Sequence, residues 1–283
     1  MTARTAPTER QKRLGYELRR MRTSAGLSAE FTAGLLGVDR GAISAMESGT
    51  RAISTDRIRT LAANCQVDDE RYIAGLTDMA LPAGPRWWDR YRGQVPQGFL
   101  DIAELESRSI RMRVAYPHHM PGLLQTSDHA LAVFRMVIPA LPEHEVALRL
   151  ALRVERQSVL DGENAPTFVT VVHEAALRLR FGSRDILRAQ LNHLIQRSEQ
   201  DNVTLLVLPF EAGGFPGAGQ TVLYAEGPTA QLDTVQIDNS HGPDFLHAET
   251  QLAKYRAHFE LMEQMALPPG ASRDFIHSIA SEL

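Results

Sequence analysis

Three arginines recur at helical spacing in the middle of the chain, at Arg149, Arg153 and Arg156. Side chains three or four residues apart lie on the same face of a helix, so these guanidinium groups are expected to point in one direction. Guanidinium groups bind carboxylates and phosphates through paired, charge-assisted hydrogen bonds. The cluster therefore indicates either a site for an anionic ligand or, more commonly on such a face, internal ion pairs and solvated charge.

Other reactive side chains lack the spacing that catalysis needs. His118 and His119 could bind a metal, but neighbours on an extended chain point to opposite faces and no third ligand follows at a diagnostic spacing. His173 precedes Glu174 without the second histidine of a zinc protease motif, so Glu174 is expected to pair with an arginine. The glycine-rich stretch 213–219 lacks the Gly-Lys-Ser/Thr ending of a phosphate-binding loop, and we expect a hairpin connection or a lid there. We therefore expect no catalytic residue, no metal and no cofactor, and we expect that the protein is not an enzyme.

The single cysteine and the absence of long apolar runs restrict the class of protein. Cys65 cannot form an internal disulfide or a cysteine-based zinc site, is expected to be a small core residue, and fits a reducing compartment. No apolar run approaches the roughly 18–20 residues of a membrane-spanning helix. Residues 1–13 are polar and basic, unlike a signal peptide. These features predict a cytoplasmic globular protein that does not bind membranes.

The formal net charge of −4 conceals an asymmetry between the two ends of the chain. Residues 1–59 carry 11 arginines and lysines against 6 acidic residues, whereas the rest of the chain carries 19 against 28. A basic N-terminal part joined to an acidic body is typical of a module that binds the phosphate backbone of DNA and a body that does not.

Five short helices separated by tight turns are predicted in the N-terminal part. Apolar residues recur at Leu14, Leu18 and Met21 among arginines, which indicates a helix with one buried stripe. Ser28 and Asp39 are well placed to cap the second and third helices. The expected helices cover residues 12–24, 28–36, 39–47, 54–64 and 69–75, after a disordered arm over residues 1–10.

The rest of the chain predicts a larger domain of helices and short strands. Residues 79–98, rich in proline and glycine, are expected to connect the two domains and, through Trp87, Trp88 and Tyr91, to pack on the second. Expected helices cover residues 102–112, 126–137, 143–160, 184–196, 248–265 and 272–283 (the last capped by Ser272), and expected strands cover 167–172, 203–208, 220–224 and 234–237. Without repeated βαβ units, we expect an all-α five-helix helix-turn-helix domain over 11–78, followed by an α+β domain over 99–283.

Several short motifs follow one another at fixed spacing in the N-terminal part. They are Arg22, Gly26-Leu27-Ser28, Leu36-Gly37-Val38-Asp39, Ile43-Ser44 and Glu47-Ser48-Gly49. Over about residues 14–75 this pattern resembles the Xre/Cro–phage repressor family of helix-turn-helix domains. The resemblance implies that the helix after Asp39 is a recognition helix, whose first residues meet base edges in the major groove of DNA.

The resemblance also implies which side chains contact DNA. Arg40 is expected to read a base, most plausibly guanine through its O6 and N7 atoms. Phosphate contacts would come from Ser28, Ser44 and Arg51. Gly41 and Ala45 also face outward by the family pattern, but they can make only close or methyl contacts.

The same resemblance implies an internal ion pair between Arg22 and Glu47. We expect this pair to be structural. Two positions depart from the family pattern: Ala29 stands where glutamine is usual, and Thr32 stands, beside Phe31, where a buried leucine is usual. A domain that serves only dimerisation is the alternative to one that binds DNA, and the arginines around the expected DNA face favour DNA.

Residues from about 87 to the end are similar to an uncharacterised domain that follows Xre-type domains in actinobacterial regulators. The matching stretches are Trp87-Trp88, Leu105-Glu106, Met120-Pro121-Gly122-Leu123-Leu124-Gln125-Thr126, Arg153-Val154-Glu155-Arg156-Gln157, His173-Glu174-Ala175-Ala176-Leu177-Arg178, Gln190-Leu191-Asn192-His193-Leu194 and Val207-Leu208-Pro209-Phe210. The resemblance implies no established chemistry. It does imply an antitoxin-like context, in which such regulators are paired with a small partner protein.

Together these features predict a homodimeric, sequence-specific transcriptional regulator whose partner is double-stranded DNA. Two alternatives stay open for the second domain. One is an antitoxin-like protein that sequesters a small protein partner. The other is a regulator that responds to a small-molecule effector, and a closed apolar cavity with converging arginine or histidine groups would favour it.

Overall fold

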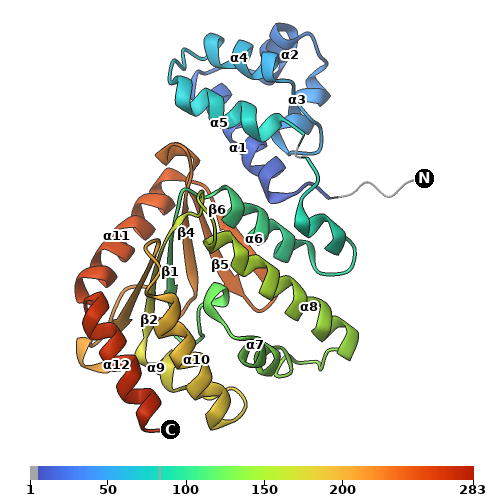
Figure 1. Ribbon diagram of the computed structural model, residues 1–283. Helices are drawn as coiled ribbons and strands as arrows, with labels where there is room; N and C mark the ends of the chain where they lie inside the picture. Colours follow the sequence, from blue (N-terminus) through green and yellow to red (C-terminus); the bar gives the residue numbers. More distant parts are fainter. Residues whose placement is uncertain (1–5, 83) are drawn as a thin grey trace. The chain divides into compact units, whose positions relative to one another are not determined.

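The computed structural model describes residues 6–82 and 84–283 (Figure 1). The chain divides into two compact units. The first comprises the chain up to Trp87 together with the short segment Pro228–Leu232, and the second comprises Trp88–Gly227 and Asp233–Leu283.

The first unit contains the five expected helices. They are α1 (Glu9–Ser24), α2 (Ala29–Leu36), α3 (Arg40–Glu47), α4 (Thr55–Asn64) and α5 (Glu70–Ala80). Each begins after a polar residue whose side chain accepts a hydrogen bond from a backbone N–H group of the first turn: Thr8, Ser28, Asp39, Ser54 and Asp69. These caps satisfy donors that the first turn of a helix leaves free, so the sequence determines where each helix starts.

The two outer helices of this unit are longer than expected. The Thr8 hydroxyl accepts from the Gln11 N–H group, and the Gln11 side chain accepts from the Thr8 N–H group, so α1 begins at Glu9. Part of the expected arm is therefore helical, and its first five residues lie outside the described residues. Helix α5 continues to Ala80, more than a turn beyond the expected end, because Leu76 is fully buried in the core.

Helices α1 and α3 approach each other closely at a glycine. A Cβ atom at Gly15 would lie 2.5 Å from the carbonyl oxygen of Glu47, so only glycine fits there. Leu18 and Ile43 are buried beside this contact, together with Ile58 of α4. The packing holds α3 firmly against the body of the unit.

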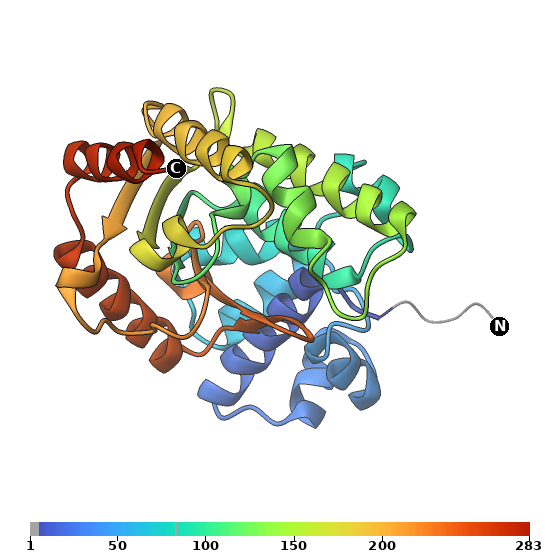
Figure 2. The same cartoon turned by 90° about the horizontal axis from the view of Figure 1, so that it is seen from below.

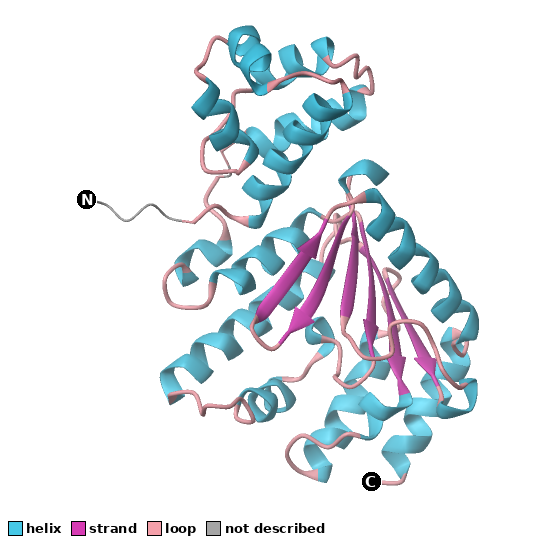
Figure 3. Cartoon of the chain, turned by 180° about the vertical axis from the view of Figure 1, so that it is seen from behind, coloured by secondary structure: helices cyan, strands magenta, loops and turns pink. Residues whose placement is uncertain are grey.

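The second unit is built on a six-stranded mixed sheet (Figure 3). The strands are β1 (Arg111–Tyr116), β2 (Thr167–His173), β3 (Val203–Leu208), β4 (Val222–Glu226), β5 (Thr234–Asn239) and β6 (Gly242–Leu246), in the spatial order β3-β2-β1-β4-β5-β6. Strands β1, β2 and β3 run parallel, and the remaining pairs are antiparallel. The mixed sheet and its helices confirm the α+β class, although helices link the three parallel strands as βαβ units, which the sequence analysis did not expect.

Longer helices cover the two faces of this sheet. They are α6 (Gln97–Arg108), α7 (Ser127–Phe134), α8 (Glu143–Arg156), α10 (Arg184–Arg197), α11 (Glu249–Met265) and α12 (Pro269–Ser281). Short helical turns connect them: η1 (Trp87–Tyr91), η2 (Gly122–Leu124), η3 (Gln157–Leu160), α9 (Glu174–Arg178) and η4 (Phe210–Ala212), while η5 (Ala230–Leu232) belongs to the first unit. None of the described helices is both long and apolar enough to cross a membrane.

Alternate side chains of the strands form two separate cores, one on each face of the sheet. On one face, Phe168 and Leu205 pack with Leu191 of α10 and Ile276 of α12, and Figure 2 shows these two helices side by side. On the other face, Val171 and Val235 pack with Phe259 of α11. Helices α10 and α12 cover the parallel half of the first face. The antiparallel half of that face therefore contacts other elements of the unit.

The central strand β1 is the main feature that the sequence prediction missed. Residues 111 and 112 fall within a helix expected over 102–112, but α6 ends at Arg108 and the chain continues as a strand. Arginine at 111 and 113 breaks the apolar pattern of a buried strand. The tertiary structure tolerates Arg113 in the interior because its Nε donates to Glu263 Oε1 at 2.8 Å and its guanidinium lies 5.2 Å from the centre of the Phe259 ring.

Three further expectations for this unit are corrected. Strand β6 was not predicted, because Gly242 and Pro243 are poor strand formers. Helix α12 begins at Pro269, so Ser272 lies inside it and does not cap it. The glycine-rich stretch 213–219 joins β3 to β4, which are not neighbours in the sheet, so it is not a hairpin connection.

Candidate functional site

The turn between α2 and α3 has the geometry of a helix-turn-helix motif. Gly37 ends α2 in the left-handed conformation, at φ 62°, which glycine adopts without strain. The Val38 N–H group then bonds the Ala33 carbonyl at 2.9 Å, and the Asp39 carboxylate accepts from the Ala42 N–H group at 2.8 Å. The turn and the cap together determine the direction in which α3 leaves.

Helix α3 buries one face and exposes the other. Ala42, Ile43 and Met46 are buried in the core of the first unit. On the outer face, Arg40, Gly41 and Ser44 are exposed and Ala45 is half-buried; the expected phosphate contacts Ser28 and Arg51 are also exposed. No carboxylate lies within ion-pair distance of Arg40 or Arg51 in the part of the chain that the structure describes. Their positive charges are therefore available to a partner.

Arg22 and Glu47 join the end of α1 to the end of α3. Arg22 Nε donates to Glu47 Oε1 at 2.5 Å, and Arg22 Nη2 donates to Glu47 Oε2 at 3.1 Å. Arg22 Nη1 also donates to the Leu27 carbonyl at 2.8 Å. The hydrogen bonds with Glu47 raise the pKa of Arg22 above its ordinary value, so they stabilise the charged guanidinium group. This bidentate ion pair holds the C-terminal end of α3 against α1.

The two departures from the expected pattern are accommodated locally. Thr32 is buried, and its hydroxyl donates to the Ser28 carbonyl at 3.0 Å, so the polar atom is satisfied inside the core. Phe31 points outward and is 57% exposed. Ala29 is half-buried at the start of α2.

A buried charge network in the first unit was missed by sequence reasoning. The Glu17 carboxylate is fully buried, pairs with Arg13, and lies 2.7 Å from Arg20 Nη2. The Tyr72 hydroxyl donates to it at 2.6 Å. Burial and the Glu17 charge raise the pKa of Tyr72, so its hydroxyl stays protonated. The spacing of Arg13, Glu17 and Arg20 on α1 was the available signal, but only the fold shows that they are inside.

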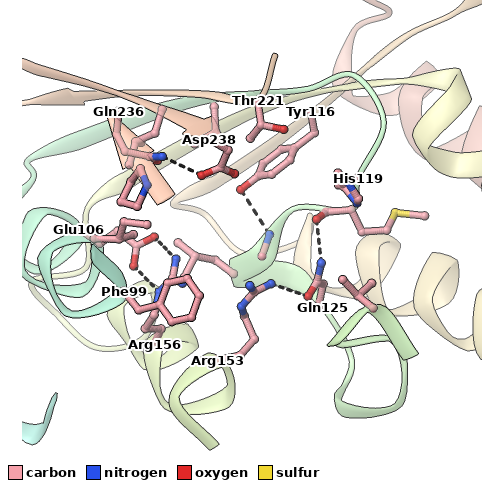
Figure 4. Close-up of a pocket in the computed structure, with 18 of the residues that line it drawn as sticks. Phe99, Glu106, Tyr116, His119, Gln125, Arg153, Arg156, Thr221, Gln236 and Asp238 are labelled. Carbon is pink, nitrogen blue, oxygen red and sulfur yellow. Dashed lines mark hydrogen bonds and ion pairs between the residues drawn. The ribbon is translucent and has the colours of Figure 1, made fainter. Parts of the chain in front are cut away.

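The second unit contains a cavity of about 500 Å³ on the antiparallel half of one sheet face (Figure 4). Helix α6 contributes Phe99, Ile102 and Glu106, and helix α8 contributes its row of arginines. Strands and their ends contribute Met112, Val114, Tyr116, Leu223, Gln236 and Asp238. The turn around η2 closes the remaining side with Met120, Gly122, Leu123 and Gln125.

Each of the three α8 arginines has a different environment in this cavity. Arg156 makes two hydrogen bonds to the carboxylate of Glu106, at 2.9 and 2.6 Å. Arg149 lies 3.6 Å from Glu145 Oε2, and its guanidinium stacks 5.4 Å from the centre of the Phe99 ring. Arg153 is the exception, since its hydrogen-bond partner is a neutral amide.

Arg153 Nη1 donates to Gln125 Oε1 at 2.6 Å, and the guanidinium stacks 5.1 Å from the centre of the Phe134 ring. No carboxylate of the described residues lies within ion-pair distance of it. Burial, aided by the charge of Arg156, lowers the pKa of Arg153 to about 10. The group is charged at neutral pH and its charge is under-compensated.

Tyr116, at the end of β1, adds a second donor to the cavity. Its hydroxyl oxygen accepts from the Gly122 N–H group at 3.3 Å, which leaves its own proton free to donate. Burial raises the pKa of Tyr116 to about 12, so the hydroxyl is protonated at neutral pH. Burial also lowers the pKa of His119 on the cavity wall, so that imidazole is neutral.

Beside this region, His129 of α7 is fully buried and has no hydrogen-bond partner for either ring nitrogen among the described residues. Its ring packs edge-on against Phe181, with 5.6 Å between centres. Burial lowers the pKa of His129 to about 4, so the imidazole is neutral in the folded protein at neutral pH.

The histidine motifs occupy separate places within residues 6–82 and 84–283. His118 and His119 both line the cavity, but the structure brings no group of three metal-binding side chains together there. Glu174 pairs with Arg178 at 2.7 Å and accepts from the Phe210 N–H group at 2.9 Å. Cys65 ends α4, half-buried against the core.

Comparisons with known proteins agree with this division of the chain. A family model described as Helix-turn-helix domain matches residues 13–72. A family model described as Domain of unknown function (DUF5753) matches residues 99–278, more than half of the chain. Searches of curated proteins and of solved structures each gave no match. The helix-turn-helix domain indicates a DNA-binding regulator, and by the extent of the second match the chain belongs to the DUF5753 family.

Proposed function

We propose that this protein is a sequence-specific, DNA-binding transcriptional regulator of the Xre type, in which α3 enters the major groove. The observation that carries the proposal is the outer face of α3, where exposed Arg40, Gly41 and Ser44 stand opposite the buried Ala42, Ile43 and Met46. A helix held by its inner face, with an uncompensated arginine at its N-terminal end, fits the way recognition helices of this motif read base edges.

The outward residues divide into three roles. Arg40 reads a base, with guanine as the best match for a guanidinium group. Ser28, Ser44 and Arg51 contact phosphates and thereby set the register of the protein on DNA. Gly41 and Ala45 carry no long side chain, so they let the helix backbone approach the groove closely. Arg22 and Glu47 stay out of the interface and support α3.

The protein acts as a cytoplasmic homodimer in this proposal. Two copies of α3 would enter one face of the DNA at half-sites roughly one helical turn, or 34–36 Å, apart. The second unit would supply the dimer contact, and residues 79–98 would connect it to the DNA-binding domain. Sequestration of a small, antitoxin-like protein partner stays a prediction from family resemblance.

The test is a genome-wide pulldown of DNA fragments by the purified protein, run beside Arg40→Ala. Arg188→Ala is the matched control, because Arg188 is a half-buried arginine of α10 in the second unit, paired with Asp185. We expect the wild type and R188A to enrich the same sites. R40A should lose site preference and keep the thermal unfolding midpoint of the wild type.

Two results would contradict the proposal at different levels. Unchanged site preference in R40A would remove the base-reading role of Arg40. A wild-type protein that enriches no DNA even at low salt, where phosphate contacts are strongest, would remove DNA binding altogether.

The cavity of the second unit favours a second candidate function, control of the regulator by a small molecule. A volume of about 500 Å³ falls within the range of known ligand pockets, roughly 300–1,000 Å³. Its apolar walls and converging arginine and tyrosine donors are the features that such a site requires. The test is the DNA affinity of the protein with and without a bound ligand, and an unchanged affinity would contradict this function.

A further inference from the structure

We infer that the cavity of the second unit binds a small organic acid that carries one carboxylate on an apolar, aromatic body, with Arg153 as the anchor of the carboxylate. The inference rests on the second candidate function, ligand control, and names the class of ligand.

The first argument is charge. Three arginines and two carboxylates line the cavity. Arg149 has a carboxylate partner outside the lining, Glu145. Glu106 is taken by Arg156 through two hydrogen bonds, and the Asp238 carboxylate accepts from Gln236 Nε2 at 2.7 Å. Of the three lining arginines, Arg153 is thus the one whose hydrogen-bond partner, Gln125, is neutral. A ligand carboxylate would give Arg153 the direct counter-charge that Arg149 and Arg156 already have.

The second argument is the convergence of donors. Gly122 lies between the two groups: its N–H group is 3.3 Å from the Tyr116 hydroxyl, and a Cβ atom on it would be 3.1 Å from Arg153 Nη1. The Tyr116 hydroxyl and the Arg153 guanidinium therefore both lie beside Gly122, and Figure 4 shows the two side chains on the cavity wall. Neither group makes a hydrogen bond or ion pair with a carboxylate of the described residues, so both can donate to an anion.

The third argument is the shape and polarity of the rest of the cavity. Apolar side chains of three helices line it: Phe99, Ile102, Val133, Phe134 and Leu152. Phe99 and Phe134 already stack on guanidinium groups, so flat faces border the anion site. The carboxylate of Asp238 also borders the cavity and disfavours a dianion such as a phosphate monoester. A monocarboxylate on an aromatic body fits both features.

The experiment is isothermal titration calorimetry of the full chain with a panel of aromatic monocarboxylates: benzoate, phenylacetate, 1-naphthoate and indole-3-acetate. Two matched probes test the charge, neutral benzamide and dianionic phenyl phosphate. We expect at least one carboxylate to bind at millimolar concentration or below, and benzamide and phenyl phosphate to bind more weakly than benzoate. Tighter binding of phenyl phosphate would reassign the site to phosphates and overturn the monocarboxylate class.

Variants then assign the anchor. Arg153→Met should weaken binding of the best carboxylate about 10- to 100-fold, which is the usual contribution of a charge-assisted hydrogen bond to affinity. Arg188→Met, on α10 and outside the lining of the cavity, should bind like the wild type. Gln125→Glu places a carboxylate on the Arg153 guanidinium from within the protein, so it should also abolish binding. Thermal unfolding of each variant separates loss of the site from loss of the fold. If R153M does not fold, Arg153→Lys replaces it in the binding measurement.

The outcomes separate this inference from the function it rests on. No binding by any carboxylate, or binding that R153M and Q125E leave unchanged while folded, would overturn the inference. Binding that depends on Arg153 but does not alter the affinity of the protein for its DNA sites would support the ligand class and contradict ligand control.

Discussion

Arg22 and Glu47 form a bidentate ion pair in the helix-turn-helix region, with nitrogen–oxygen distances of 2.5 and 3.1 Å. Each of the two side chains is only 13% exposed. The pair joins the last turn of α1 to the last residue of α3 across 25 residues of sequence. Because the pair is shielded from water, its loss would leave one charge without compensation.

Glu47→Gln is therefore expected to destabilise the first unit by about 3–5 kcal/mol, since Arg22 would be left partly buried without a counter-charge. Urea unfolding followed by circular dichroism measures the change. Glu70→Gln is the control, because Glu70 pairs with Arg59 on the surface, where both side chains are more than half exposed and a pair contributes under about 1 kcal/mol. Equal losses in E47Q and E70Q would contradict the structural role of the pair.

Gly15→Ala is expected to destabilise the protein by about 1–3 kcal/mol and to weaken DNA binding, because a methyl group would force α1 and α3 apart. The added Cβ atom would lie 2.5 Å from the Glu47 carbonyl oxygen, which is backbone and cannot move alone. Gly34→Ala is the matched control: nothing lies within 4 Å of its Cβ position on α2, and alanine favours a helix over glycine. If G15A unfolds at the same urea concentration as G34A, the close approach of the two helices is wrong.

His129 is expected to make the protein less stable as the pH falls below neutral. Its folded-state pKa of about 4 is below the ordinary value of 6.5, so the unfolded chain binds a proton first. The stability that the neutral imidazole contributes is complete above about pH 6.5 and is lost between about pH 6.5 and 4. At pH 5 the loss amounts to about 2 kcal/mol.

Urea unfolding of the wild type and His129→Leu at pH 7 and pH 5 measures this loss. H129L should be less sensitive to the change in pH by about 2 kcal/mol. His144→Leu, which removes an exposed histidine at the start of α8, should keep the sensitivity of the wild type. The assignment fails should H129L and H144L respond alike.

Ser272→Ala is expected to cost about 1–3 kcal/mol, because it leaves a buried N–H group and a partly buried carbonyl group without this partner. The Ser272 hydroxyl accepts from the Val207 N–H group at 2.9 Å and donates to the Leu267 carbonyl at 2.8 Å, joining α12 to β3. Ser278→Ala, whose hydroxyl is exposed and bonds only within α12, is the control and should change the stability little. Thermal unfolding of both variants decides between a bridging and an ordinary helical serine.

The N-terminal unit is largely readable from the sequence, because its determinants are local. Ser28 and Asp39 cap their helices through side chains that act within three residues, and Gly37 supplies the left-handed turn between α2 and α3. The buried and exposed faces of α3 follow from helical periodicity alone. Such short-range interactions depend on residues that are close together in the chain, so one sequence suffices to predict them.

The second unit depended on contacts between residues far apart in the chain. Strand β1 was hidden by Arg111 and Arg113, and only Glu263, 150 residues away from Arg113, explains a buried arginine in a central strand. The sequence showed that three arginines share one face of α8, but it did not distinguish internal ion pairs from an anion site. The tertiary structure gives both answers: it places Glu106, 50 residues from Arg156, as the partner of one arginine, and it leaves Arg153 facing Gln125 in a cavity. Long-range pairing selects the partner of each charge, and no spacing in the sequence encodes that choice.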